Sequence, residues 1–115
     1  MTDEEKRQFR RSKPWSNFRQ RMRLRFDKKD YITCEDLLRD WNLHHLDMND
    51  KHYTDLSKPD KFLPLNRETH KFVHWLFRFY RHDRDVLRRL KFVMDMMLIY
   101  NPPRRKRRHT IKETD

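Results

Sequence analysis

The chain has 115 residues, a length that favours one domain. Charged residues make up 41% of it and hydrophobic residues 35%, so the core must be small, while an aromatic content of 13% argues against a fully disordered chain. The formal net charge of +11 favours a polyanionic partner, nucleic acid before an anionic membrane. The absence of glycine excludes a Walker loop and a dinucleotide-binding fingerprint, because both need glycine.

The charge is unevenly distributed along the chain. Basic residues outnumber acidic ones in residues 1–30, 66–100 and 101–115, whereas acidic residues prevail in residues 31–65. The single cysteine, Cys34, excludes an intrachain disulfide and fits a reducing compartment. No apolar run reaches the ~18–20 residues that cross a bilayer, and the N-terminus lacks the apolar region of a secretory signal. We therefore expect a soluble, cytoplasmic protein with no membrane partner.

The N-terminal part is predicted to contain one helix. Residues 1–11 are expected to be a charged, flexible lead-in. A helix is predicted over about residues 14–26, because Ser12 and Pro14 mark a helix start. Four apolar side chains then recur at helical spacing and form one face: Trp15, Phe18, Met22 and Phe26.

The middle of the chain is predicted to hold short strands. Residues 31–38 open with β-branched side chains and form one candidate strand, and residues 39–46 form a second. Residues 61–65 are predicted to be extended, since Pro64 disfavours helical geometry at Leu63. Without glycine, any residue with positive φ is expected to be Asn or Asp.

A helical pattern resumes at Asn66. Its predicted core-facing stripe is Phe72, Val73, Leu76 and Tyr80. Asp83 is expected to cap a last helix that runs to about residue 99, with one face formed by Val86, Leu90, Val93 and Met97. Residues 101–115 are predicted to be a disordered basic tail.

Histidines are the residues most suited to chemistry. His70 and His74 lie four apart in the predicted helix, so their rings share one face and could fill two corners of a metal site, although two surface histidines would show the same spacing. His44 and His45 lie in a predicted strand, where side chains alternate between faces. One ring could therefore join a metal site while the other faces a substrate, or one could pack in the core while the other is exposed.

The histidines follow the order His-His, loop, extended segment, then His-x-x-x-His on a helix. This order resembles the HNH endonucleases, whose ββα-metal finger places an imidazole base and a divalent cation on one phosphate. Two stretches resemble the finger itself: "LHHLD" (43–47) and "KFLPLNRETHKFVHWL" (61–76). A third, "SKPWSNFRQRMRLRFDKKDYITCEDL" (12–37), resembles the helix and Cys-bearing hairpin that precede the finger in small phage-encoded members. The resemblance covers about residues 12–80.

The resemblance implies an α+β fold, with a ββα-metal finger between a preceding amphipathic helix and a C-terminal helix, over residues 12–100. It implies hydrolysis of DNA, by nicking or cleaving, in a phage or mobile-element context and hence in the cytoplasm of a bacterial host cell. His45 matches the general base. The matching metal ligands are His44, His70 and His74, for one divalent ion whose identity stays open among Mg, Mn, Zn and Ni.

Two departures from the family pattern stand out. Lys61 occupies the position of the central Asn, and lysine has donors but no acceptor, so Asp60 or Asn66 would have to supply the acceptor. Cys34 has no cysteine partner, which argues against a second, structural zinc. The alternative function is therefore a catalytically weak or inactive HNH-like module that binds nucleic acid. Asp47 follows the strand too closely to be counted as a metal ligand.

Several basic residues are candidates for contacts with the DNA backbone, which would not read sequence. Solvated surface charges would show the same pattern. The candidates are Arg67, Lys71, Arg104, Arg105 and Lys106. The expected partner is DNA, bound by a monomer or a homodimer.

Overall fold

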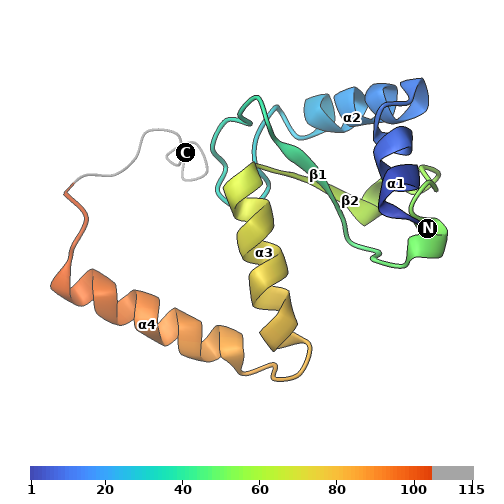
Figure 1. The fold of residues 1–115 in the computed structure, drawn as a ribbon. Helices are drawn as coiled ribbons and strands as arrows, with labels where there is room; N and C mark the ends of the chain where they lie inside the picture. Colours follow the sequence, from blue (N-terminus) through green and yellow to red (C-terminus); the bar gives the residue numbers. More distant parts are fainter. Residues whose placement is uncertain (105–115) are drawn as a thin grey trace. The chain divides into compact units, whose positions relative to one another are not determined.

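The structure is a computed structural model that describes residues 1–104 (Figure 1). The elements in chain order are α1 (Asp3–Arg10), α2 (Lys13–Arg25), β1 (Asn42–His45), the 3-10 turns η1 (Asp50–His52) and η2 (Pro59–Lys61), β2 (Phe62–Leu65), α3 (Arg67–Tyr80) and α4 (Val86–Tyr100). This mixture of helices with a small antiparallel sheet agrees with the expected α+β class. One compact unit spans Met1–His70 and a second begins at Lys71, inside α3.

The N-terminal residues form a helix instead of the flexible lead-in expected over residues 1–11. Thr2 Oγ1 accepts from the Glu5 amide at 3.1 Å, and Glu5 Oε1 accepts from the Thr2 amide at 2.8 Å. This reciprocal pair is a capping box, which satisfies two amide groups that a helix start leaves without partners. The Thr-x-x-Glu spacing was the sequence signal for α1.

Helix α2 agrees with the helix predicted over residues 14–26, and it builds the core of the first unit. Ser12 Oγ accepts from the Trp15 amide at its N-terminus, and Pro14 occupies its first turn. Its buried face packs with three residues of the strands and the segment before them. The cluster comprises Trp15, Phe18, Met22, Trp41, Leu43 and Phe62.

Strands β1 and β2 form an antiparallel pair, with His45 opposite Phe62 and His44 opposite Leu63. The strand predicted over residues 39–46 therefore exists but begins only at Asn42. Leu43 joins the core with α2, and the His45 ring contacts Trp15 from α2. Because side chains alternate along a strand, His44 points to the opposite face.

The strand predicted over residues 31–38 does not form, and Asp30 provides the reason. Its Oδ1 accepts from the amides of Ile32 at 2.8 Å and Thr33 at 2.9 Å, while its backbone carbonyl accepts from the Cys34 amide. These bonds close a turn with amides that a sheet would otherwise use. Only an isolated bridge between Lys29 and Asp36 remains.

The turn also corrects an expectation about backbone conformation. It leaves Cys34 exposed. Positive φ occurs at Asp27, as anticipated for an Asp, but also at Lys28 and Cys34. Such a conformation costs roughly 1–2 kcal/mol for a residue with a Cβ atom, so the bonds around Asp30 must offset that cost.

Asp30 also ties this turn to the start of α3. The side chain is 1% exposed, and its Oδ2 accepts from the Asn66 amide at 2.8 Å. Asn66 extends the link, because its Oδ1 accepts from the Leu38 amide at 2.7 Å and its Nδ2 donates to the Asp36 carbonyl at 3.0 Å. A carboxylate beside the first amides of a helix is electrostatically favourable. The N-terminal end of α3 is thus fixed to the first unit.

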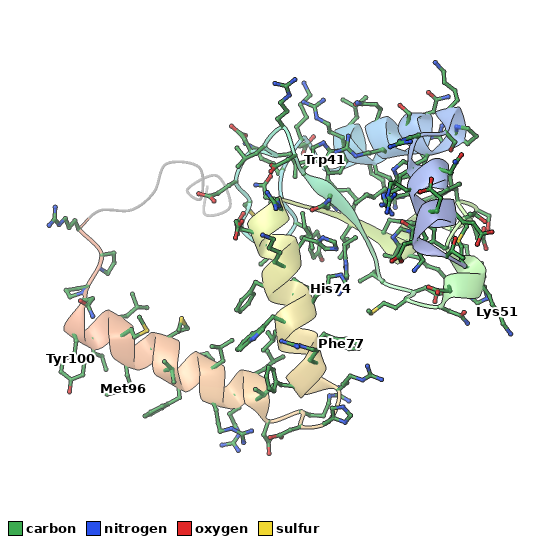
Figure 2. All side chains as sticks on the ribbon, in the orientation of Figure 1. Trp41, Lys51, His74, Phe77, Met96 and Tyr100 are labelled. Carbon is green, nitrogen blue, oxygen red and sulfur yellow. The ribbon has the colours of Figure 1, made fainter. Side chains whose placement is uncertain are left out.

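The apolar faces predicted for the last two helices are only partly covered. Over residues 67–100, neither helix contains a buried residue. Phe72, expected in the core, is 46% exposed, and Val93 is 48% exposed. Figure 2 shows Met96 and Tyr100 extending from α4.

The start of α4 also differs from prediction. The N-cap position belongs to Asp85, whose side chain makes no capping bond. The predicted cap, Asp83, instead accepts from the Asp85 amide at 3.0 Å and pairs with Arg89. Asp83 therefore closes the turn before the helix and does not cap the helix itself.

Part of the predicted basic tail, 101–115, lies outside the described residues, which end at Arg104. In residues 1–104, no helix combines the length and the apolar character needed to span a bilayer.

Replacing Asp30 by Asn should destabilise the first unit. Burial by itself raises the pKa of Asp30, but hydrogen bonds outweigh it and lower the pKa below its ordinary value; the donors are Thr33, Asn66, Thr69 and Ile32. An Asn amide would place a donor against donors, so Asp30→Asn should lower the free energy of unfolding by about 2–3 kcal/mol. Urea unfolding followed by circular dichroism measures this loss.

The loss of stability in Asp30→Asn should become smaller as the pH falls. A lowered pKa in the folded state means that Asp30 contributes fully above its unfolded-state pKa of about 3.9. The contribution disappears as the pH falls through the folded-state pKa, so the gap between wild type and Asp30→Asn should shrink in acid. Asp40→Asn is the control, because Asp40 is exposed and lies 3.9 Å from Arg67. An equal loss in both variants would contradict the buried role of Asp30.

Candidate metal centre and the His45 pocket

Three histidines form a cluster that could hold a metal ion. One ring nitrogen from each of His44, His70 and His74 lies within 4.8 Å of the other two. His44 comes from β1, and the other two come from successive turns of α3, which is one continuous helix. Figure 2 marks His74 on this helix. The ligand set expected from the sequence is therefore brought together.

The positions of His44 and His70 follow from the fold of the first unit. His44 is 7% exposed and faces away from the α2 core, as strand alternation requires. Asp30 and Asn66 fix the start of α3, which places His70 in its first turn. The two ring centroids lie 5.1 Å apart at an interplanar angle of 68°. An edge-to-face approach of this kind leaves ring nitrogens able to converge.

The donor chemistry of the cluster fits a transition-metal ion. Two nitrogens that bind one Zn²⁺ at about 2.1 Å each lie at most about 4.2 Å apart. The observed upper limit of 4.8 Å therefore requires only a small closing movement of the rings. Neutral imidazoles suit Zn²⁺ and Ni²⁺ better than Mg²⁺. Three protein ligands with an open position are typical of catalytic zinc sites, whereas structural sites have four.

His45 lies outside this cluster, on the other face of β1. Its ring stacks on Tyr53 with centroids 4.6 Å apart and an interplanar angle of 10°. Trp15 lies parallel to it with a centroid distance of 5.6 Å, and Phe62 meets it edge-on at 4.9 Å. Burial in this aromatic setting lowers the pKa of His45 below its ordinary value, which favours the neutral ring near pH 7.

The hydrogen bond of His45 defines its tautomer. Nε2 lies 3.3 Å from the backbone carbonyl oxygen of Tyr53. A carbonyl oxygen only accepts, so Nε2 must carry the proton and donate it. In the neutral ring, Nδ1 therefore holds the lone pair. The backbone of Tyr53 left no signal in the sequence, because any residue type can supply a carbonyl group.

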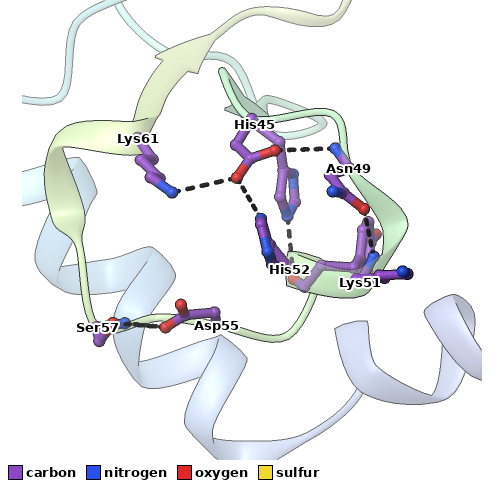
Figure 3. A network of polar contacts seen from close by, with 9 residues as sticks. His45, Asn49, Lys51, His52, Asp55, Ser57 and Lys61 are labelled. Atoms are coloured by element: carbon purple, nitrogen blue, oxygen red, sulfur yellow. Dashed lines mark hydrogen bonds and ion pairs between the residues drawn. The ribbon is translucent and has the colours of Figure 1, made fainter.

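A polar network adjoins His45 in the loop between the strands (Figure 3). Lys61 Nζ donates to Asp47 Oδ2 at 3.1 Å, and His52 Nδ1 donates to the same oxygen at 2.7 Å. These side chains line a small pocket together with His45, Asp55 and Phe62. The acceptor for Lys61 is therefore Asp47.

The two residues expected from sequence to supply the acceptor that lysine lacks are engaged elsewhere. Asp60 accepts from Arg25 Nη2 at 3.0 Å. Asn66 is buried and joined to Asp30, Leu38 and Asp36. The sequence did not indicate His52 as the second donor, since its spacing from Asp47 matches no known pattern.

Of the basic candidates for DNA contacts, those within the described residues are exposed. Arg67 lies 3.9 Å from Asp40, and Lys71 and Arg104 are exposed at the surface. Arg105 and Lys106 lie outside the described residues. The exposed positions are accessible to a polyanion.

Metal binding should depend on the cluster and not on histidine in general. His74→Ala removes one of three ligands and should weaken Co²⁺ or Zn²⁺ binding at least about tenfold, or 1.4 kcal/mol. His82→Ala, which alters an exposed histidine outside the cluster, should leave the affinity unchanged. Isothermal titration of the full chain measures both affinities. Equal affinities for the two variants would rule out the cluster as the binding site.

A scan against protein-family models, a search of curated proteins and a search of solved structures each find no match for this chain. The assignment of function therefore depends on the geometry of the histidines and on the motifs that contain them.

Proposed function

We propose that this protein is a metal-dependent endonuclease of the HNH type that hydrolyses DNA phosphodiester bonds. In this proposal β1, β2 and the first turns of α3 correspond to the ββα-metal finger. The supporting observation is the cluster of His44, His70 and His74, since its members occupy the motif positions of the family's metal ligands. Nothing in the sequence separation of His44 from the other two histidines requires it to meet them.

The three histidines would hold one divalent ion through neutral ring nitrogens. When bound, such an ion supplies Lewis-acid stabilisation of negative charge on the phosphate and on the leaving oxygen. The role of the protein is to hold three donors on two rigid elements and to leave a coordination position open for substrate. Burial of His44 limits competing water on one side of the cluster.

His45 is the proposed general base. Its Nε2 donates to Tyr53, so its Nδ1 is the atom that could accept a proton from the attacking water. The lowered pKa favours the form of the ring that can accept this proton. Attack by water on phosphorus with departure of the 3′ oxygen would leave a 5′-phosphate and a 3′-hydroxyl.

The charge of the chain supports a nucleic-acid substrate. A net charge of +11 on 115 residues attracts the phosphate backbone without reading base sequence. Arg67 and Lys71 lie on α3, the helix that carries two of the clustered histidines, and are exposed. We infer that they contact backbone phosphates near the cluster.

Two observations favour the second candidate, an inactive module that binds nucleic acid. The first is that Lys61 replaces the motif Asn. The second is that the His45 ring is half-buried and stacked between Tyr53 and Trp15. A base held this firmly must still be reached by a water molecule. Activity separates the candidates, because both predict binding to DNA.

The decisive variant is His45→Ala, tested on supercoiled plasmid with Mg²⁺, Mn²⁺, Zn²⁺ and Ni²⁺ in turn. Loss of a general base typically costs about 10²–10⁴-fold in rate. We therefore expect nicking by the wild type with at least one ion, near-complete loss in His45→Ala, and DNA affinity within a few fold. Gel analysis of plasmid forms and fluorescence anisotropy measure the two quantities.

His82→Ala serves as the control and should nick at the wild-type rate. Full activity in His45→Ala would reject this residue as the base. Absence of nicking by the wild type with every ion, together with retained DNA binding, would favour the inactive module.

A further inference from the structure

The loop that leaves β1 after His45 returns to β2, and a hydrogen bond joins its two ends. The Leu46 amide donates to the Lys61 carbonyl at 2.8 Å, which continues the pairing of the strands by one step. Tyr53, whose carbonyl oxygen accepts the hydrogen bond from His45 Nε2, lies in the middle of this loop. The position of the His45 ring therefore depends on how the loop is held.

Asp47 holds the loop from inside. Its Oδ1 accepts from the Asn49 amide at 2.9 Å. Its Oδ2 accepts from His52 Nδ1 and from Lys61 Nζ, as the dashed lines of Figure 3 show. One carboxylate thus joins the start, the middle and the end of the loop. These three hydrogen bonds lower the pKa of Asp47 well below its ordinary range, so the carboxylate stays ionised.

The contact with His52 bears directly on Tyr53, because the two residues share a peptide bond. The η1 turn ends at His52, and the Tyr53 amide donates to the Asp50 carbonyl at 3.2 Å. Fixing His52 therefore restricts the peptide that leads into Tyr53. The carbonyl group of Tyr53 follows this peptide and is separated from it only by the Cα atom of Tyr53.

Helix α1 braces the loop from outside. Lys6 Nζ pairs with Asp50 at 2.8 Å, and Arg10 Nη1 donates to the Tyr53 hydroxyl at 2.8 Å. Both contacts reach the same turn that Asp47 holds through His52. Asp55 differs, although it lines the same pocket, because its carboxylate accepts from Ser57. Its contact with His52 runs through the backbone, where the Asp55 amide donates to the His52 carbonyl at 3.0 Å.

We propose that Asp47, clamped by His52 and Lys61, is a positioning residue that holds the Tyr53 carbonyl against His45 and so keeps Nδ1 of that ring available. The catalytic consequence rests on the proposed function, but the effect on the ring does not. Lys61 joins the end of the loop to Asp47 through an ion pair at 3.1 Å. Exposed ion pairs add little to stability, so the clamp acts on geometry more than on folding.

The experiment uses the full chain and two readouts. The first is the tautomer of His45, read from long-range proton–nitrogen NMR spectra of the ring at neutral pH. The second is the single-turnover nicking rate, measured beside DNA affinity. Asp47→Asn is the main variant, since it keeps Oδ1 for Asn49 but sets an amide donor against His52 and Lys61. Lys61→Met removes the charge by another route.

We expect the wild type to show one tautomer, protonated at Nε2. Asp47→Asn and Lys61→Met should give a mixture of tautomers and a rate about 10–100-fold lower, because small misplacements of a catalytic group have effects of this size. DNA affinity should stay unchanged. Lys61→Arg, which keeps the positive charge, should show the wild-type tautomer and the wild-type nicking rate.

Asp55→Asn is the matched control and should match the wild type, since Oδ1 of Asp55 makes both of its bonds to Ser57. Unchanged tautomers in Asp47→Asn and Lys61→Met would overturn the proposal, as would a shifted tautomer with an unchanged rate or an equal effect of Asp55→Asn. If the wild type nicks with no ion, the proposed function fails, and the tautomer comparison alone decides the positioning role.

Discussion

The carboxylate of Asp30 is the contact on which the first unit depends. This one buried side chain accepts hydrogen bonds from two amides of its own turn through Oδ1 and from the Asn66 amide through Oδ2. The turn is thereby joined to the start of α3, and α3 carries His70 and His74. A buried charge is costly unless it is fully hydrogen-bonded, and the same requirement makes the position of the helix specific. The alternation of side chains along β1 then points His44 toward that helix.

The two adjacent histidines point to opposite faces of the strand that carries them. His44 belongs to the histidine cluster that could hold a metal ion, while His45 is enclosed by aromatic rings on the α2 side. The same packing that builds the core of the first unit therefore sets the electrostatic environment of His45. Its lowered pKa and its single hydrogen-bonded nitrogen are consequences of burial and of loop backbone. The proposed roles of the two rings differ because their surroundings differ, although the residues are chemically identical.

The loop between the strands shows how a lysine at position 61 is accommodated. Lysine at position 61 cannot accept a hydrogen bond, but it meets a carboxylate, Asp47, that accepts from both Lys61 and His52. Asp47 and Lys61 therefore form an ionic contact within the loop. Asp60 and Asn66, which were expected to supply the acceptor that lysine lacks, are both engaged elsewhere. The partner lay fourteen residues earlier in the chain.

Local patterns in the sequence determined helix α2, the extended segment of β2, the helical spacing of His70 and His74, and the capping box of α1, because these depend on neighbours within one or two turns. The convergence of His44 with that pair was expected only through the order of the motifs. Tertiary structure alone decided three features: the link from the Asp30 carboxylate to the start of α3, the partner of Lys61, and the carbonyl that orients His45. It also left the apolar faces of α3 and α4 partly exposed. Each of these depends on which distant groups meet in space, and backbone amides and carbonyls, which every residue carries, leave no trace in the order of side chains.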